Sequence, residues 1–592
     1  MHIKALSARL TLVLLLVTSM LAAGAATSHS KTKTVPASAV LSATACEQGR
    51  LAAALDRFSG EQATTLDGVV WFSGGQTDDG KAASAANPLL PAHCIVTGVI
   101  GAHSGPPGAT RYGNHFRLRI PSYWNGRLFF QGGGGNNGSV GNAIGPLKDG
   151  QNALAQGYAV VAQDSGHVGR TPEFALDRKA YTDFAYQGVH DVSLVAKAII
   201  KAYAGRGPAR SYFVGCSNGG REAMVTAQRY TDFDGVVAGN PGFATYDQWL
   251  QNMDVLRIVA RVAGVAAGTV AVDTSSAYRD DQLAFVADYF MEKCDKLDGV
   301  ADGLVSNYLA CKAGPNDYQK LLCKQDGGDS DDPRCLNGIQ SEGLQGIHAG
   351  VHDRNHKLIF PGFLPGSVER VMRDPYLGKP GGPALGSFYS SIMPNLYFMG
   401  YGFRGYPHLT GSADELASYP ASSLAYVADF DIDSEPAKLA QGRLDFNGGN
   451  VDPRRPGPNF EAFRRRGGKM LIYTGTADPA VQATGVMAFM DRLNAQYQPK
   501  EAGAMARLFM VPGMNHCRGG ATADQFDQLA PLVEWVERGI APEEIVARAA
   551  PGSELDRQRL GFSRPLCVYP RYAKYKGSGD PAAANSFVCS SD

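Results

Sequence analysis

The pentapeptide Gly215-Cys216-Ser217-Asn218-Gly219 constrains the fold of this chain more than any other feature of its sequence. The apolar run Ser211–Val214 before it is typical of a buried strand, and Arg221–Arg229 after it is typical of a helix. A serine in a glycine-flanked turn between strand and helix is the arrangement that exposes a nucleophile, and the glycines permit a strained turn. The alternative is that Ser217 only caps the helix. The flanking elements favour the nucleophile.

Short apolar strands alternate with helical segments on both sides of this turn. Such alternation predicts a parallel sheet covered by helices. Together with the serine turn, it predicts an α/β fold with an α/β-hydrolase core. The predicted strands are Arg127–Phe130, Tyr158–Gln163, Lys469–Tyr473 and Ala506–Val511, and the predicted helices are Tyr186–Tyr203 and Ala523–Arg538.

The N-terminus has the layout of a secretory signal peptide. Lys4 and Arg9 precede the apolar run Leu10–Ala23, and small residues follow. A single membrane anchor is the alternative, but the run is shorter than the ~20 apolar residues of a spanning helix. We therefore expect a protein that is secreted or periplasmic. Its ten cysteines, an even number, suit an oxidising compartment.

The domain organisation follows from where the alternation of strands and helices stops. From about residue 244 to 466 the chain is rich in Gly, Asp and Pro and shows little such alternation. We interpret this segment as a large lid inserted into one core, and 592 residues suffice for more than one domain. The predicted parts are a signal peptide (1–26), a flexible linker (27–40), the first part of the core (41–243), the lid (244–466) and the second part of the core (467–592).

The charge of the chain is balanced. Lys and Arg together number 56, as do Asp and Glu, so the formal net charge is zero. This composition offers no electrostatic basis for binding nucleic acid or an anionic membrane. We expect a small-molecule substrate, with no nucleic acid and no membrane as a partner.

A serine nucleophile needs a base, and the base needs a carboxylate to orient it. In an α/β hydrolase both follow the serine along the chain, in the order acid and then histidine. Asp478 comes just after the strand Lys469–Tyr473, and His516 comes just after the strand Ala506–Val511. We therefore predict Ser217, Asp478 and His516 as the catalytic residues.

The negative oxygen of a tetrahedral intermediate needs two backbone donors, one after the nucleophile and one from an early loop. Asn218 follows Ser217, and the glycine-rich loop Gly132–Gly135 follows an early strand. We predict the NH groups of Asn218 and Gly135 as the donors. A phosphate-binding loop is the alternative, but no Gly-Lys-Ser/Thr sequence ends this glycine run.

Each of two predicted catalytic residues has a cysteine as its direct neighbour. Cys216 precedes Ser217, and Cys517 follows His516. One disulfide could therefore tie the nucleophile to its base.

The chain resembles the tannase and feruloyl esterase family over nearly all of its mature length. The resemblance rests on Gly-Cys-Ser-Asn-Gly-Gly-Arg-Glu at 215–222, Gly-Gly-Lys-Met-Leu-Ile-Tyr at 467–473 and Val-Pro-Gly-Met-Asn-His-Cys at 511–517. It implies hydrolysis of esters of aromatic acids, such as ferulic or gallic acid, through an acyl-enzyme. Hydrolysis of mono(2-hydroxyethyl) terephthalate, which the family includes, is an alternative. A binding protein that has lost its chemistry is the alternative of another class.

The resemblance also implies a set of disulfides and a structural calcium ion, remote from the chemistry. Carboxylate and carbonyl oxygens are the ligands that Ca²⁺ prefers. The implied calcium ligands are the side chains of Asp295, Asp298 and Asp302 with the backbone oxygens of Val300 and Leu304. The implied disulfides are Cys216–Cys517, Cys46–Cys94, Cys294–Cys311, Cys323–Cys335 and Cys567–Cys589.

Overall fold

The computed structural model describes residues 39–84, 87–105, 110–266, 273–379, 431–434, 446, 448 and 459–592. The predicted signal peptide lies outside the described residues, and so does the predicted linker apart from Ala39–Val40. These two residues form the short strand β1, which pairs with β5 (Tyr123–Trp124). Within the described residues, no helix combines the length and the apolar character needed to cross a membrane.

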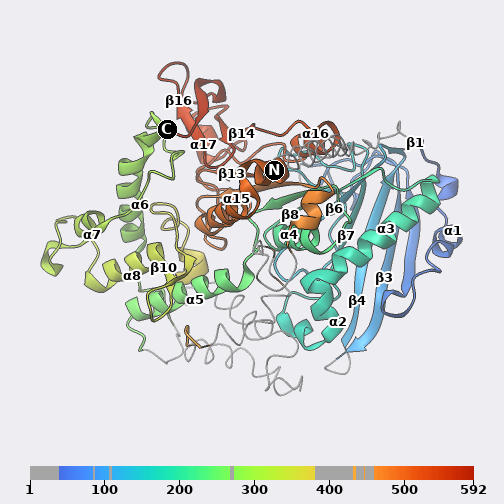
Figure 1. Ribbon diagram of the computed structural model, residues 1–592, viewed down its shortest axis with the longest axis horizontal. Coiled ribbons are helices and arrows are strands. Elements are labelled where there is room, and N and C mark those ends of the chain that lie inside the picture. Colours follow the sequence, from blue (N-terminus) through green and yellow to red (C-terminus); the bar gives the residue numbers. More distant parts are fainter. Residues whose placement is uncertain are drawn as a thin grey trace, which may run out of the picture. The chain divides into compact units, whose positions relative to one another are not determined.

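A twisted nine-stranded sheet forms the centre of the described chain, in the order β13-β12-β9-β8-β6-β7-β4-β3-β2 (Figure 1). The strands β7, β6, β8, β9, β12 and β13 run parallel, and β4, β3 and β2 add an antiparallel edge. The bounds are β2 Thr64–Phe72, β3 His93–Gly105, β4 Thr110–Pro121, β6 Arg127–Gln131, β7 Ala159–Gln163, β8 Arg210–Cys216, β9 Gly235–Gly239, β12 Lys469–Gly475 and β13 Ala506–Val511. The predicted strands are therefore confirmed to within a few residues.

Helices cover both faces of the sheet because alternate residues of each strand point to opposite faces. Leu128 and Phe130 of β6 belong to one buried cluster, and Phe129 between them belongs to another. The first cluster includes apolar residues of α3 and α15, and the second includes Leu532 of α16. These helices are α3 Gly188–Ala204, α15 Ala483–Met505 and α16 Ala530–Arg538. The α/β-hydrolase core is thus confirmed.

The predicted helix Ala523–Arg538 is wrong in its first half. Gln525 exchanges both backbone hydrogen bonds with Arg548 of a distant strand, so the segment before Ala530 is not helical. Pairing between segments far apart in sequence has overridden the local helical pattern. The strand concerned, β14 (Glu544–Arg548), pairs with β15 (Ser563–Cys567), and β16 (Tyr572–Tyr575) pairs with β17 (Phe587–Ser590).

The chain between β9 and β12 leaves the sheet, and Figure 1 shows its helices in green and yellow apart from the strands. Their apolar side chains form a second buried cluster together with earlier residues such as Phe174 and Phe184. The helices α5, α6 and α8 supply Leu250, Val286 and Leu344 to this cluster. The elements are α5 Thr245–Val262, α6 Asp280–Cys294, α7 Pro315–Leu321, α8 Gly338–Ala349, β10 Gly350–His352, β11 Leu358–Pro361 and α14 Glu461–Arg465.

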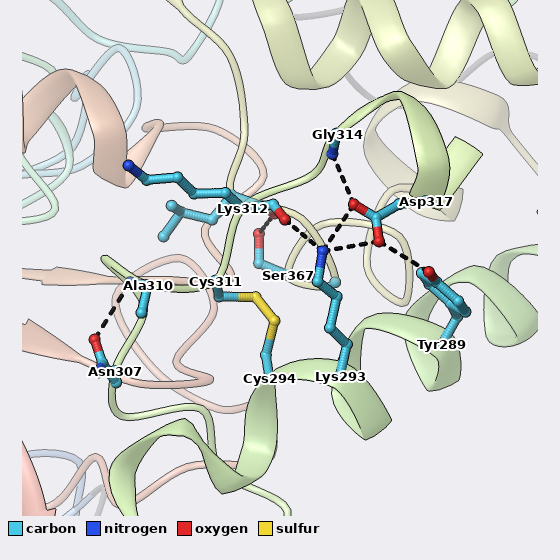
Figure 2. The surroundings of a disulfide bond; sticks show 12 residues. Tyr289, Lys293, Cys294, Asn307, Ala310, Cys311, Lys312, Gly314, Asp317 and Ser367 are labelled. Carbon is cyan, nitrogen blue, oxygen red and sulfur yellow. Dashed lines mark hydrogen bonds and ion pairs between the residues drawn. A yellow bond between two sulfur atoms is a disulfide. The ribbon is translucent and has the colours of Figure 1, made fainter. Parts of the chain in front are cut away.

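The end of α6 is fastened to the start of α7 by an ion pair beside the disulfide Cys294–Cys311 (Figure 2). The ammonium of Lys293 lies 2.8 and 2.7 Å from the two carboxylate oxygens of Asp317. Asp317 also accepts hydrogen bonds from the hydroxyl of Tyr289 and the NH of Gly314. Burial acts to raise the pKa of Asp317, but these donors outweigh it and the pKa is lowered. The carboxylate therefore stays ionised and joins the two helices.

Candidate active site

Ser217 lies at the sharp turn between β8 and α4 (Asn218–Arg229). Its φ of 64° is in the left-handed region, where a non-glycine residue is held at a cost of roughly 1–3 kcal/mol. Its NH donates to the carbonyl of Gly239 at 2.9 Å, and its carbonyl accepts from Arg221 and Gly242 at 3.0 and 3.2 Å. Neighbouring segments thus hold the strained serine from both sides.

The two glycines of the pentapeptide serve close packing, and the strained conformation belongs to the serine itself. A Cβ on Gly215 would lie 2.6 Å from the backbone of Gly219, and a Cβ on Gly219 would lie 2.7 Å from the carbonyl oxygen of Gly133. Neither glycine has a positive φ. The glycines therefore permit the turn, as expected, by leaving room for the close approach of the backbone, while Ser217 itself adopts the strained conformation.

The structure brings Ser217, His516 and Asp478 into one line of contacts. The Nε2 atom of His516 lies 2.7 Å from the hydroxyl oxygen of Ser217. Its Nδ1 atom lies 2.8 Å from Oδ2 of Asp478. In this line the imidazole can accept the hydroxyl proton at one nitrogen while the carboxylate orients the other.

Asp478 is almost completely buried, yet each of its carboxylate oxygens has partners. Oδ1 accepts hydrogen bonds from the NH groups of Ala480 and Val481 at 2.7 and 2.9 Å. Oδ2 accepts from Asn240 as well as from His516. These bonds fix the carboxylate in one orientation toward the imidazole.

Burial acts to lower the pKa of His516, since it disfavours the charged imidazolium. The charge and the hydrogen bond of Asp478 outweigh burial, and the pKa is raised above its ordinary value. The imidazole is therefore a stronger base than a free histidine, which suits a group that must take a proton from an alcohol.

The glycine-rich loop Gly132–Gly135 lies against the turn at Ser217, but the NH groups of its first two residues already donate hydrogen bonds. Gly132 donates to the carbonyl of Val214 at 2.9 Å, and Gly133 donates to Oε2 of Glu222 at 3.2 Å. Gly135 has a φ of 59°, and its NH has no acceptor among the described residues. Asn218 is the first residue of α4, where a backbone NH has no partner within the helix. The two predicted donors are thus available, while Gly132 and Gly133 are not.

Glu222, a fully buried carboxylate that sequence reasoning missed, joins this loop to α4. Besides Gly133, it accepts a hydrogen bond from the side chain of Asn137 at 2.7 Å and a longer one from the side chain of Asn218 at 3.4 Å. Burial raises its pKa, and the positive charge of Arg221 and these donors oppose the rise. Asn240, which holds Asp478, was missed as well. Glu222 lies in α4 a few residues after Ser217, and Asn240 directly follows β9 (Gly235–Gly239). Their positions in the sequence do not reveal their roles, because these depend on the direction of each side chain.

All five disulfides that the family resemblance implies are formed in the structure. Cys216 and Cys517 are 301 residues apart in sequence and 6.1 Å apart at Cα. Their bond joins the residue before Ser217 to the residue after His516. Cys517 also has a left-handed backbone, with a φ of 65°. The two halves of the site are therefore covalently tied.

The three aspartates of the implied calcium site are close in sequence but differ in their partners. Asp295 accepts from the NH groups of Gly303 and Leu304 at 2.9 and 3.1 Å. Asp298 is completely buried, and within the described part of the chain its Oδ2 has no hydrogen-bond partner. Asp302 is paired with the buried Arg564. Among the described residues, no three acidic, histidine or cysteine side chains converge as metal ligands.

The end of this segment at Leu304 packs against the loop that carries His516. Leu304 is buried in the same apolar cluster as Met514, two residues before His516. A Cβ on Gly513 would lie 3.3 Å from the side chain of Leu304. The segment therefore supports the loop that carries the candidate base.

Comparison with known proteins bears on the function of this site. A sequence model described as "Tannase and feruloyl esterase" matches residues 94–387 and 455–590. Mono(2-hydroxyethyl) terephthalate hydrolase of Piscinibacter sakaiensis is 36% identical over 558 residues, which cover 89% of this chain and 88% of that protein. A probable feruloyl esterase B-1 of Aspergillus fumigatus is 27% identical over 489 residues, covering 79% and 81%.

The fold is similar to that of a solved structure. The crystal structure of feruloyl esterase B from Aspergillus oryzae superposes with a TM-score of 0.69 at 22% identity, covering 91% of this chain and all of that one. At this identity the likeness bears on the fold alone.

Proposed function

Because the chain belongs to the tannase and feruloyl esterase family and is a carboxylic ester hydrolase, we propose that it is a serine esterase of aromatic, phenolic acid esters. The observation that carries the proposal is the line of contacts from Ser217 through His516 to Asp478. Ester hydrolysis is the activity of the family, whereas the catalytic residues, the acyl-enzyme mechanism and the phenolic substrates are proposed here.

In the proposed reaction, the hydroxyl oxygen of Ser217 attacks the ester carbonyl while Nε2 of His516 takes its proton. Asp478 keeps the imidazole oriented and stabilises its positive charge. The NH groups of Asn218 and Gly135 donate to the negative oxygen of the tetrahedral intermediate. His516 then returns the proton to the leaving alcohol, and water hydrolyses the acyl-enzyme by the same route.

The relatives support the proposed substrate class. The names of the relatives include a feruloyl esterase and a hydrolase of a terephthalate monoester, and both act on an aromatic acyl group. An aromatic ring bonded to the reacting carbonyl or conjugated with it is thus the shared feature. We favour phenolic esters, and the 36% identity to the terephthalate monoester hydrolase makes that monoester the second candidate.

We expect the purified protein to hydrolyse methyl ferulate or methyl gallate with a higher kcat/KM than mono(2-hydroxyethyl) terephthalate. Steady-state rates on these esters at one pH, with methyl acetate as the control that lacks the ring, measure the preference. A higher kcat/KM on the terephthalate monoester would establish the second candidate. Equal rates on methyl acetate would contradict recognition of the aromatic acyl group.

We also propose that the protein is exported. All ten cysteines are paired in the structure, and the chain has no free thiol. Disulfides in such number persist in oxidising compartments and are rare in the cytosol of most organisms. This supports the sequence-based expectation of a secreted or periplasmic protein.

A structural calcium ion remains a proposal, and the buried aspartates support it. Burial raises the pKa of Asp298, and it raises the pKa of Asp302 to about 6. Burial thus disfavours the ionised form of both carboxylates, and Oδ2 of Asp298 has no hydrogen-bond partner among the described residues. A divalent cation bound by Asp295, Asp298 and Asp302 and by the carbonyls of Val300 and Leu304 would offset this cost. The cation would share Asp302 with Arg564.

Removal of calcium with a chelator is expected to lower the Tm by at least about 3 °C, because a bound ion stabilises only the folded state. Thermal denaturation with and without added Ca²⁺, together with elemental analysis of the purified protein, measures this. Asp298→Asn removes one charged ligand and should make the Tm insensitive to the chelator. Protein that contains no calcium and has the same Tm in both conditions would refute the site.

A further inference from the structure

Lys148 contacts the loop that carries His516 but has no role in the proposed reaction of Ser217. Its ammonium donates a hydrogen bond to the carbonyl oxygen of Cys517 at 2.9 Å. The nitrogen also lies 5.4 and 5.1 Å from the ring centroids of Tyr473 and Phe526. Among the described residues, its strongest carboxylate neighbour is Asp524, whose charge acts on the ammonium without forming an ion pair. The ammonium is thus held by a carbonyl and two aromatic rings. Burial of a charged lysine in such surroundings costs free energy.

The carbonyl that Lys148 contacts belongs to a strained residue. Cys517 is in the left-handed region, and it follows His516 directly. A conformation of this kind persists only where its surroundings hold it. Two contacts do so at Cys517: the disulfide to Cys216 fixes its side chain, and Lys148 fixes its carbonyl.

The backbone of Lys148 is itself anchored, so its side chain extends from a fixed point. Its NH donates to Oε1 of Gln528 at 3.1 Å, and Leu147 beside it is buried. Within the loop that follows His516, Asp524 accepts a hydrogen bond from the NH of Gly519 at 2.8 Å. The loop from His516 to Asp524 is therefore braced at both ends.

We propose that Lys148 is a positioning residue whose ammonium holds the carbonyl of Cys517 and thereby sets the imidazole of His516 at hydrogen-bond distance from Ser217. The inference rests on the proposed function, because it assigns Lys148 a role in the reaction of Ser217. A shift of about 1 Å in a reacting group can lower a rate by ~10²-fold. A contact one residue away from the base can therefore affect the rate strongly.

The charge of Lys148 makes this contact sensitive to pH. Burial lowers its pKa to about 8, with Asp524 opposing and Arg518 adding to the effect. Tyr473 on β12 stays neutral in this range because burial raises its pKa. Other titratable groups on the adjoining segments are Asp149 and Asp527. Above pH 8 the ammonium loses its proton, and a charge-assisted hydrogen bond becomes a neutral one of about half the strength.

Activity and stability are expected to respond in opposite directions. The folded-state pKa lies below the ordinary value of 10.5, so the charged form is less favourable in the folded protein than in the unfolded chain. Below pH 8 the charge of Lys148 therefore costs stability, and this cost is relieved between about pH 8 and 10.5. The hold on Cys517 weakens over the same range.

Lys148→Met and Lys148→Arg test the proposal, with Lys469→Met as the matched control. Lys469 also donates to a backbone carbonyl, that of Ala504 at 2.8 Å, and lies 5.4 Å from the ring of Trp535. Burial lowers its pKa too. It begins β12, at the opposite end of that strand from Asp478. The control thus removes the same kind of contact away from the site.

We expect Lys148→Met to lower kcat on a phenolic ester by roughly 10- to 100-fold, with KM changed less than about threefold and Tm unchanged or higher. Lys148→Arg keeps a permanent charge, so it should retain more activity and lose the fall in kcat above pH 8. Lys469→Met should keep the wild-type kcat. The readouts are kcat and KM from pH 6 to 10 and the Tm of each variant.

The proposal is overturned if Lys148→Met has the kcat of Lys469→Met, or if Lys148→Arg keeps the wild-type pH profile. The second variant decides the question if the first does not fold. Failure of the proposed function is a separate outcome, since wild-type protein would then neither turn over the ester nor take up a fluorophosphonate at Ser217.

Discussion

Ser217→Ala is expected to lower kcat by about 10⁵-fold, because removing the nucleophile of a serine hydrolase leaves only substrate binding and oxyanion stabilisation. The substitution removes one hydroxyl that contacts His516 and leaves the backbone of the turn unchanged. The Tm should therefore change little. Steady-state hydrolysis of a phenolic ester and covalent labelling by a fluorophosphonate measure the loss.

Ser193→Ala is the matched control for this experiment. The hydroxyl of Ser193 in α3 is buried and has no hydrogen-bond partner among the residues that the structure describes, so its removal leaves none of their polar groups unpaired. The control should keep full labelling and full activity. Residual turnover above about 1% in Ser217→Ala would reject the assignment of the nucleophile. Wild-type protein that binds an aromatic ester but takes no label would instead favour a binding protein without chemistry.

Replacing Cys216 and Cys517 together by alanine is expected to cost both stability and rate. The disulfide closes a loop that spans 301 residues, and the loop-entropy relation places its contribution at roughly 6 kcal/mol as an upper limit. The same bond holds Cys517 in its left-handed conformation beside His516, so kcat of the folded fraction should fall by at least about tenfold. Thermal denaturation and kcat per folded molecule, with folding checked by circular dichroism, test both expectations.

The pair Cys567 and Cys589 provides the comparison. This disulfide closes a loop of 22 residues between β15 and β17, at a distance in sequence from the predicted catalytic residues. Its removal should cost roughly 3 kcal/mol and leave kcat of the folded protein unchanged. An unchanged kcat in the Cys216 and Cys517 variant as well would mean that the disulfide stabilises the protein but does not position the base.

Most of the core could be predicted because its elements repeat a local pattern. The strands β6, β8, β12 and β13 are short apolar runs, and each lies within a few residues of its predicted bounds. The helix predicted from Ala523 was half wrong, because Gln525 pairs with Arg548 far along the chain. Local periodicity carries no information about a partner that is more than 20 residues away.

Some residues of the candidate site could likewise be predicted from the sequence, and others could not. Ser217, Asp478 and His516 could be named from sequence because the order of elements in an α/β fold determines where each loop ends up. Glu222 and Asn240 could not, because an acid within a helix and an amide after a strand have many ordinary roles. Only their hydrogen bonds to Gly133 and Asp478 distinguish them.

The sequence by itself determined the α/β-hydrolase core, the family, the sharp turn at Ser217 and the two loops that meet it. These follow from patterns within a few residues, which short-range sterics and apolar periodicity control. The tertiary structure alone decided which groups hold that site in place. Lys148 reaches Cys517 across 369 positions of sequence, and Asn240 reaches Asp478 across 238. Such contacts depend on packing distance and side-chain direction, and the sequence encodes both only through the complete fold.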